Sequence, residues 1–401
     1  MENKNWKRTR IPCHNALVKI VLAPNAFKGS LTASEAAACI ERGLRKALRG
    51  LSVIKLPMAD GGDGTLLAIV AATGGRVVPC RVTDPLGRKI RSMFGLTGDG
   101  RTAVIEMALA SGLALLKPPE RNPMLTSSRG TGELIRAALD RRVQEIVIGI
   151  GGSATNDGGM GMLEALGARF FAASLEALPA CGESLGLVEN IDLSRLDARL
   201  KRVRITVICD VTNPLLGPEG AAAVYAPQKG ANAAAVAALE AGMAKYAALF
   251  QRQHGLDIAG FPGAGAAGGL GAALGGVLRA TLRPGIDAML DLVGFDDLIA
   301  GAGLVVSGEG RLDGQSVRYG KAVAGIARRC AHAGIPLAVI TGGMGPEAEM
   351  IFDVTFSSVM PLVPRPMPLE EALAAAGPLF EGAADRMFRF IKIGYKMGGG
   401  R

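Results

Sequence analysis

The sequence predicts an α/β protein in which a second α/β domain, with a mixed sheet, is inserted into a domain built from both chain ends. The first observation is that short, β-branched apolar runs alternate with helical patterns along the whole chain. The second is that the 56 glycines gather in short loops between these runs. The third is a change of pattern after residue 85, which ends when plain strand–helix units return near residue 290.

These changes of pattern set the expected domain limits. We predict a first domain from residues 16–85 and 291–395, an inserted domain from residues 86–290, and a basic tail over residues 1–15. With 49% hydrophobic and 20% charged residues, the chain is not a largely disordered protein. Its 401 residues are enough for two or three substantial cores.

Local patterns predict the individual elements. A strand over residues 17–23 leads into a helix that begins at a capping box of Thr32 and Glu35. Alternating apolar and polar residues over 76–107, with turn signals between them, indicate a local antiparallel or mixed sheet. The remaining expected strands are residues 53–58, 146–150, 204–209, 304–307 and 335–341. Helices are expected after residue 65, from near Thr131, from near Met160, and over residues 232–253, 321–330 and most of 369–393. Loops and short helices are expected over residues 173–200.

Composition narrows the classes of partner. One Trp and four Tyr argue against a nucleic-acid surface of stacking aromatics, and the net charge of +9 favours anionic small molecules. The six cysteines are scattered without a CxxC pair, which predicts reduced thiols, and no signal-peptide pattern follows the basic tail. We therefore expect a cytoplasmic protein with a small-molecule substrate and no nucleic-acid or membrane partner, with homo-oligomer formation left open.

The main functional signal lies in residues 145–160 (EIVIGIGGSATNDGGM). A buried strand, a glycine-rich loop and a helix start form the arrangement that aims backbone N–H groups at an anion. Asp157 in this loop is a candidate to hold a metal ion or to accept a proton. A tight turn with capping polar residues is the alternative interpretation of this loop.

Acidic residues stand beside glycines at several other strand exits. Because the carboxyl ends of parallel strands meet at one edge of a sheet, we expect these exits to line one site. Phosphoryl transfer needs such a mixture, in which carboxylates hold Mg²⁺ and backbone amides and Lys or Arg neutralise phosphate charge. Taken singly, each acid is better explained as a turn residue or a helix cap than as a catalyst. The exits carry Asp60 with Asp63, Asp210, and Glu309 with Asp313, and Lys28 is their basic counterpart.

A different function is indicated by residues 263–268, which match GxGxxG, with Asp287 at a distance suited to a ribose contact. This match leaves an NAD(P)-dependent dehydrogenase of a small hydroxy acid as an alternative. The residues before the match make a poor strand, however, and no histidine-based hydride-transfer site accompanies it.

Between about residues 18 and 341, six segments resemble the bacterial type-1 glycerate kinase family. The resemblance implies ATP- and Mg²⁺-dependent phosphorylation of D-glycerate, usually to 2-phosphoglycerate. It also implies a Rossmann-like domain made from both chain ends, an inserted α/β domain, and an active site in the cleft between them. The segments are APNAFKGSLTASEAA, LPMADGGDGT, GTGELIRAALDRRVQEIVIGIGGSATNDGGMGMLEALGA, CDVTNPLLGPEGAAAVYAPQKGA, PGAGAAGGLGAAL and VVSGEGRLDGQS.

With this resemblance, each candidate residue receives an expected role. Asp157 and Asp210 are candidates for the general base, and we expect Asp157 to face the cleft. Lys28, Lys229 and Arg311 are expected to bind the glycerate carboxylate or the ATP phosphates. The predicted catalytic residues are Asp157, Asp210 and Lys28; the substrate- and ATP-binding residues are Asn25, Ser30, Asp60, Asp63, Gly151, Gly152, Ser153, Thr155, Asn156, Lys229, Gly268 and Arg311; and the Mg²⁺ ligands are Asp210, Glu309 and Asp313.

The chain departs from the family pattern at Asn25, where Asp is usual, and at Asp63, where Glu is usual. Loss of a carboxylate at Asn25 removes a contact to metal or substrate. It motivates a further alternative, a non-catalytic sugar-acid-binding homologue.

Overall fold

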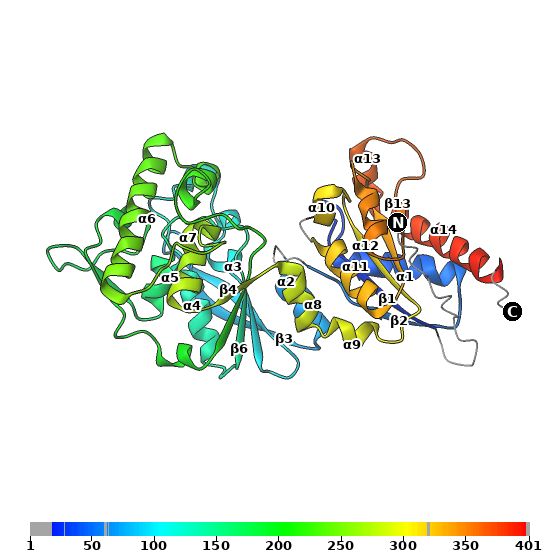
Figure 1. Ribbon diagram of the computed structural model, residues 1–401, viewed down its shortest axis with the longest axis horizontal. Helices are drawn as coiled ribbons and strands as arrows, with labels where there is room; N and C mark the ends of the chain where they lie inside the picture. Colours follow the sequence, from blue (N-terminus) through cyan, green and yellow to red (C-terminus); the bar gives the residue numbers. More distant parts are fainter. Residues whose placement is uncertain (1–17, 28, 60–61, 63, 319–320, 398–401) are drawn as a thin grey trace, which may run out of the picture. The chain divides into compact units, whose positions relative to one another are not determined.

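The computed structural model describes residues 18–27, 29–59, 62, 64–318 and 321–397. The chain forms two compact units, and we describe each by itself. The terminal unit comprises Met1–Met58 and Gly294–Arg401, and the inserted unit comprises Ala59–Val293. The colours of Figure 1 follow this division, because dark-blue and yellow-to-red segments belong to the terminal unit and light-blue to yellow-green segments belong to the inserted unit.

The terminal unit is built on a five-stranded parallel sheet of order β13-β12-β11-β1-β2. Apolar side chains of β1 and β11 pack with helices α1 and α14 in one core, and these two helices lie side by side (Figure 1). Its elements are β1 (Val18–Pro24), α1 (Ala33–Ala47), β2 (Leu51–Lys55), α9 (Phe295–Ile299), β11 (Leu304–Glu309), α10 (Gly314–Arg318), α11 (Ala322–Ala333), β12 (Leu337–Thr341), η8 (Ala348–Met350), α12 (Ile351–Val354), β13 (Ser357–Pro361), α13 (Leu369–Ala374) and α14 (Ala376–Met397).

Two local features explain why α1 forms and packs as it does. The predicted capping box is confirmed: Glu35 N–H donates to Thr32 Oγ1 (3.2 Å), and Thr32 N–H donates to Glu35 Oε2 (2.8 Å). Gly43 faces α14, where a Cβ would lie 2.5 Å from the carbonyl oxygen of Glu381. A side chain at this position would therefore push the two helices apart.

The inserted unit is built on a six-stranded mixed sheet of order β10-β9-β6-β5-β4-β3, in which β3, β4 and β5 are antiparallel neighbours and β5, β6, β9 and β10 run parallel. Its elements are α2 (Thr65–Ala72), β3 (Arg76–Thr83), β4 (Lys89–Leu96), β5 (Thr102–Glu106), α3 (Ala108–Ser111), η1 (Leu113–Leu115), η2 (Pro118–Glu120), α4 (Arg129–Leu139), β6 (Glu145–Gly149), α5 (Met160–Ala165), β7 (Arg169–Phe171), η3 (Gly182–Gly186), β8 (Asn190–Asp192), η4 (Ala198–Lys201), β9 (Arg204–Ile208), η5 (Ala221–Tyr225), η6 (Pro227–Lys229), α6 (Ala233–His254), α7 (Ala266–Ala272), η7 (Ala273–Val277), β10 (Thr281–Arg283) and α8 (Gly285–Leu292).

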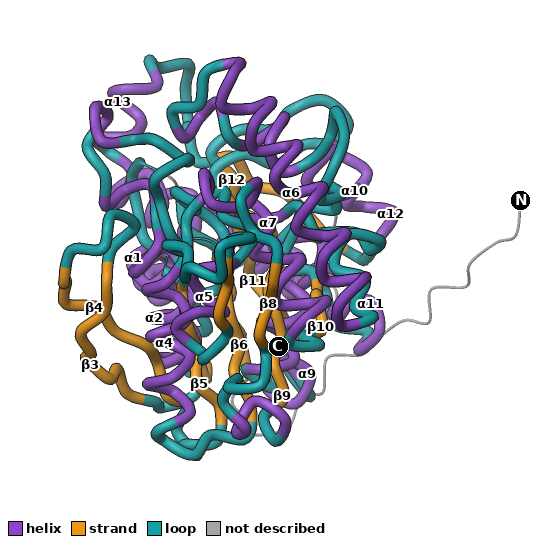
Figure 2. Tube along the Cα trace, turned by 90° about the vertical axis from the view of Figure 1, so that its left-hand side faces the viewer, coloured by secondary structure: helices purple, strands orange, loops and turns teal. Residues whose placement is uncertain are grey.

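The α/β class and the mixed sheet are confirmed, but the first join between units lies earlier than the sequence suggested. The units meet in the chain at Met58–Ala59 and Val293–Gly294, whereas we placed the joins after residues 85 and 290. The reason is the β3–β4 hairpin, visible as paired orange strands in Figure 2. It draws β3 into the six-stranded sheet, and α2 packs on it because Gly95 leaves room for Val70.

Helix α6 has the length and apolar composition to cross a membrane, and it is the one such helix among the described residues. Its Leu239, Met243, Tyr246, Leu249 and Phe250 are nevertheless at most 1% exposed and belong to the core of the inserted unit. The core helix of a globular domain meets the same criteria of length and composition, and 33% of the apolar window of α6 is buried in the inserted unit.

Candidate functional site

The loop that follows β6 has three successive backbone N–H groups without a protein acceptor among the described residues, at Gly151, Gly152 and the buried Ser153. Gly151 and Gly152 are exposed, and Gly152 has a left-handed backbone with φ of +73°. Within the described part of the chain, the N–H groups of Gly151, Gly152 and Ser153 donate no hydrogen bond to a protein acceptor. Successive unpaired N–H groups at a turn of this kind form a concavity that binds anions. We call residues 151–153 the anion cradle.

Asp157 lies behind this cradle and faces the interior. Its carboxylate is 0% exposed. Oδ2 accepts hydrogen bonds from Ser128 N–H (2.7 Å), Ser128 Oγ–H (2.7 Å) and Gly161 N–H (3.1 Å), and Oδ1 accepts one from Gly159 N–H (3.1 Å). Burial raises the pKa of Asp157, and these hydrogen bonds oppose that rise. The expectation that Asp157 faces a cleft was therefore wrong, because its carboxylate ties the start of α4 to the start of α5.

Asp157→Asn is expected to lower the free energy of unfolding by about 1–3 kcal/mol, because the amide nitrogen cannot accept from the N–H groups that now meet a carboxylate oxygen. The melting temperature of the variant would show this loss. Asp140→Asn is a matched control in the same unit, since the Asp140 side chain is 63% exposed. Equal melting temperatures for the two variants would contradict a supporting role for Asp157.

Lys229 also lies beneath the cradle. The residue is 2% exposed, and its Nζ donates to Ser153 Oγ (2.7 Å) and to the carbonyl oxygen of Thr155 (2.7 Å). Burial lowers the pKa of Lys229 to about 7, and the charge of Asp157 opposes that shift. Both of these hydrogen bonds from the Lys229 amine therefore go to residues of the loop.

Two more predicted binding residues shape the same loop. Gly268 accepts from Gly158 N–H (3.1 Å) and has φ of +69°, and a Cβ there would collide with the carbonyl oxygen of Thr155. Asn156 is fully buried, and its Nδ2 donates to the carbonyl oxygen of Ala221 (3.0 Å). The structure brings both residues to this loop, and the contacts described here are with protein atoms that support the loop.

Asp210 is an exposed acid of the inserted unit that follows one of its parallel strands. It follows β9, the parallel neighbour of β6, so it stands at the same sheet edge as the cradle loop. Its Oδ1 accepts from Gly285 N–H (2.6 Å) at the start of α8. Asp210 is exposed, and a carboxylate that is both anchored and in reach of solvent is suited to accept a proton from a bound hydroxyl.

In the terminal unit, predicted residues gather where β1 and β11 end. These strands are parallel neighbours, with Pro24 opposite Gly308, and Asn25 N–H donates to the carbonyl oxygen of Gly308 (2.8 Å). Asn25 and Glu309 therefore follow at one edge of the sheet. The side-chain oxygen of Asn25 accepts from Ala26 N–H (2.7 Å).

The next residues along this edge carry opposite charges. Arg311, whose side chain is 70% exposed, lies 3.4 Å from Asp313. Asp313 Oδ1 accepts from Ser316 N–H (2.9 Å) at the start of α10, and this bond lowers the pKa of Asp313. Ser30 donates to the carbonyl oxygen of Phe27 (3.1 Å). The predicted residues Lys28, Asp60 and Asp63 lie outside the described residues.

The predicted Mg²⁺ ligands are divided between the two units. Asp210 belongs to the inserted unit, and Glu309 and Asp313 belong to the terminal unit. Among the described residues, no three His, Cys, Asp or Glu side chains gather at a common point. Mg²⁺ in kinases commonly takes one or two carboxylates together with phosphate oxygens and water. Glu309 ends β11 and Asp313 follows in the next loop, so two carboxylates stand close in the chain at this strand end, and a Mg²⁺ site stays a prediction.

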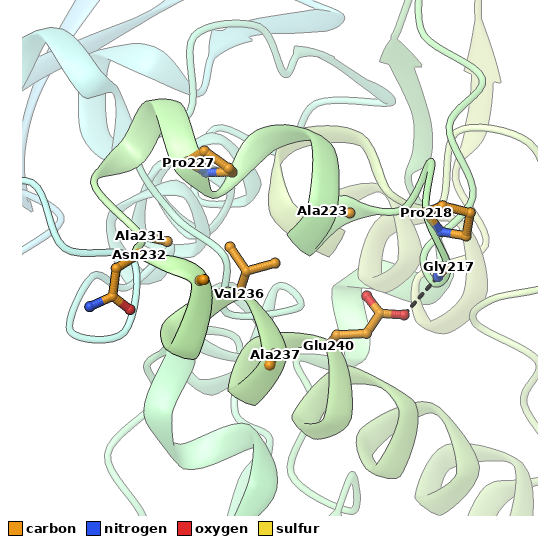
Figure 3. A pocket seen from close by; sticks show the side chains of 10 residues that line it. Gly217, Pro218, Ala223, Pro227, Ala231, Asn232, Val236, Ala237 and Glu240 are labelled. Carbon is orange, nitrogen blue, oxygen red and sulfur yellow. Dashed lines mark hydrogen bonds between the residues drawn. The ribbon is translucent and has the colours of Figure 1, made fainter.

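A hollow of about 610 Å³ lies between the 217–227 segment and the start of α6 (Figure 3). Its walls are mostly Ala, Pro and Val side chains, and Glu240 accepts from Gly217 N–H (2.6 Å) at its side. It contains none of the predicted site residues. This hollow could not be predicted from the sequence, because small apolar residues on a helix and a turn are also typical of ordinary packing.

The GxGxxG match does not form a dinucleotide-binding motif. No strand lies between the end of α6 at His254 and residues 263–268, a stretch that the structure describes throughout; turns lead from α6 into α7. The motif requires a strand before its first glycine. The dehydrogenase alternative therefore has no structural support.

Comparisons with known proteins agree on one family. The model of the glycerate kinase family matches residues 20–392. The chain is 44% identical to a glycerate kinase of Bacillus subtilis (strain 168), over 95% of this chain and 99% of that one. It is 42% identical to a glycerate 2-kinase of Escherichia coli (strain K12), over 93% and 96%.

A solved structure leads to the same family. The crystal structure of a glycerate kinase 2 from Salmonella typhimurium LT2 superposes with a TM-score of 0.84 at 42% identity, covering 95% of this chain and 100% of that one. The family model covers residues of both units. The chain belongs to the glycerate kinase family.

Proposed function

We propose that this protein transfers the γ-phosphoryl group of ATP to the 2-hydroxyl of D-glycerate, giving 2-phosphoglycerate. The family and the relatives named glycerate kinase and glycerate 2-kinase support this substrate and this reaction. The observation that carries the proposal is the anion cradle, whose three N–H groups remain available at the carboxyl end of a parallel strand. Neither a dehydrogenase nor a non-catalytic homologue is favoured by any observation.

The roles within the site follow from exposure and bonding. The cradle holds the phosphoryl group through its N–H donors, and Asp210 accepts the proton of the 2-hydroxyl as the oxygen attacks phosphorus. Arg311 is exposed and offers positive charge to a phosphate or to the glycerate carboxylate. Asn25, Ser30, Lys28, Asp60 and Asp63 complete the proposed substrate and ATP contacts.

The proposed metal ligands are Glu309, the last residue of β11, and Asp313 in the loop that follows. Glu309 and Asp313 would hold Mg²⁺, which neutralises phosphate charge when bound. Activity is expected to vanish in excess EDTA and to return when Mg²⁺ is restored, as measured by ADP release. Full turnover in excess EDTA would show that no divalent cation is needed.

The reaction itself is tested by two measurements on the same sample. ADP release is followed with D-glycerate, tartronate and hydroxypyruvate as acceptors, and phosphorus NMR assigns the product. We expect fastest release with D-glycerate and the resonance of the 2-phosphate. A 3-phosphate product would correct the position of transfer, and ADP release without dependence on D-glycerate would overturn the substrate.

We extend the proposal to a cytoplasmic enzyme whose partners are glycerate and ATP, without a nucleic-acid or membrane partner. Size-exclusion chromatography with light scattering would decide between a monomer and a homo-oligomer.

A further inference from the structure

We propose that Lys229 is a positioning residue, which holds the anion cradle in its binding conformation from behind and makes no contact with ATP or glycerate. This inference rests on the proposed function, because it concerns the loop assigned to phosphate there. It reverses the first expectation that Lys229 binds the ligand's negative charge directly.

Lys229 has little access to solvent. The residue is 2% exposed, and two protein oxygens, each 2.7 Å away, take hydrogen bonds from its Nζ. A ligand could reach this amine only by displacing Ser153 or Thr155. Those residues belong to the loop that would have to be intact for the phosphate to bind.

The direction of the two bonds is the second argument. A peptide unit is planar and trans, so its C=O and the following N–H point in opposite directions. By binding the carbonyl oxygen of Thr155, Lys229 therefore fixes the direction of the Asn156 N–H as well. Its second bond anchors Ser153, the last residue of the cradle.

The composition of the loop is the third argument. Gly149, Gly151 and Gly152 follow one another closely, and glycine loses more conformational freedom on ordering than any other residue. The backbone preferences of such a segment do not select a single conformation. Lys229 enters from η6, a separate turn of the chain, and supplies two directed bonds to the stretch that follows the glycines.

The decisive experiment combines amine labelling with a double-mutant cycle. Intact enzyme is treated briefly with an acetylating reagent, with and without an ATP analogue, and each lysine is quantified by mass spectrometry. We expect Lys229 to remain unlabelled in both samples. Lys245, whose side chain is 35% exposed, should be labelled in both. Labelling of Lys229 that ATP suppresses would overturn the proposal, because it indicates an accessible, ligand-contacting amine.

The cycle uses Lys229→Met, Ser153→Ala and the double variant, with Lys245→Met as the matched control. We expect Lys229→Met to lower kcat by about 10–100-fold, since a displacement of about 1 Å at a reacting group can cost 10²-fold. The double variant should lie within about threefold of the worse single variant, because both changes break the same contact. Fully multiplicative losses would contradict positioning through Ser153.

A readout without turnover keeps the two proposals separate. Amide hydrogen exchange over residues 150–157 of the free protein should be faster in Lys229→Met and in Ser153→Ala than in the native protein. If native enzyme fails to phosphorylate D-glycerate, the proposed function falls, while exchange and labelling still decide the role of Lys229. Unchanged exchange in both folded variants would refute it.

Discussion

Asp210→Asn is expected to lower the kcat of glycerate phosphorylation by about 10²–10⁴-fold, the usual contribution of a general base. The amide cannot accept the proton of the 2-hydroxyl, but its oxygen can still accept from Gly285 N–H, as Asp210 Oδ1 does at 2.6 Å. The start of α8 therefore remains capped, and the melting temperature should stay near that of the native protein. Steady-state kinetics and thermal unfolding of one preparation measure both quantities.

Asp257→Asn provides the matched control. Asp257 is an exposed acid of the same unit that accepts from the N–H groups of Ala259 and Gly260 in a loop. It stands after a helix, away from the carboxyl ends of the parallel strands, so its replacement should leave kcat unchanged. Equal kcat values for the Asp210 and Asp257 variants would remove Asp210 from the reaction.

Gly268→Ala should destabilise the inserted unit by about 2–5 kcal/mol and reduce activity with it. A side chain at φ of +69° costs about 1–2 kcal/mol, and its Cβ would also collide with the carbonyl oxygen of Thr155, adding about 1–3 kcal/mol of overpacking. Relief of the collision moves the oxygen that Lys229 binds. The cradle would thus be displaced even in molecules that remain folded.

Gly255→Ala separates the two costs of this change. Gly255 has φ of +66° at the end of α6, but a Cβ there would have no heavy atom within 4 Å. The free energy of unfolding of this variant should fall only by the backbone cost of about 1–2 kcal/mol, and its activity should be unchanged. If both alanine variants melt at the same temperature, the close approach of Gly268 to the loop has no energetic importance.

The strands that carry the site could be predicted because their sequences are unambiguous. Ile146 and Ile148 of β6 are 0% exposed, and a continuous β-branched run is typical of a strand covered on both faces. The start of the inserted unit was harder, because the alternation in β3 begins at Arg76 while Pro79 and polar neighbours weaken it. The short, half-buried β13 offered still less pattern and was not predicted.

The site shows a different limit of sequence analysis. Glycines and polar residues after β6 predicted an anion-binding loop, because the need for backbone donors is visible in residue type. Which side chain faces a ligand is decided by packing between distant segments, as when η6 brings Lys229 to Ser153 across 76 positions. The residue type alone does not show whether a lysine is buried or exposed. The sequence could therefore not show that the side chains of Asp157 and Lys229 are buried and bonded to protein atoms.

The anion cradle is the central claim, and amide-resolved hydrogen exchange with and without Mg²⁺ and a non-hydrolysable ATP analogue tests it most directly. A bound phosphate accepts hydrogen bonds from the N–H groups of Gly151, Gly152 and Ser153, so these amides should exchange at least about tenfold more slowly in the complex, since each 1.4 kcal/mol of added protection is a factor of ten. Unchanged exchange at all three amides, with nucleotide binding established in the same sample, would contradict the cradle.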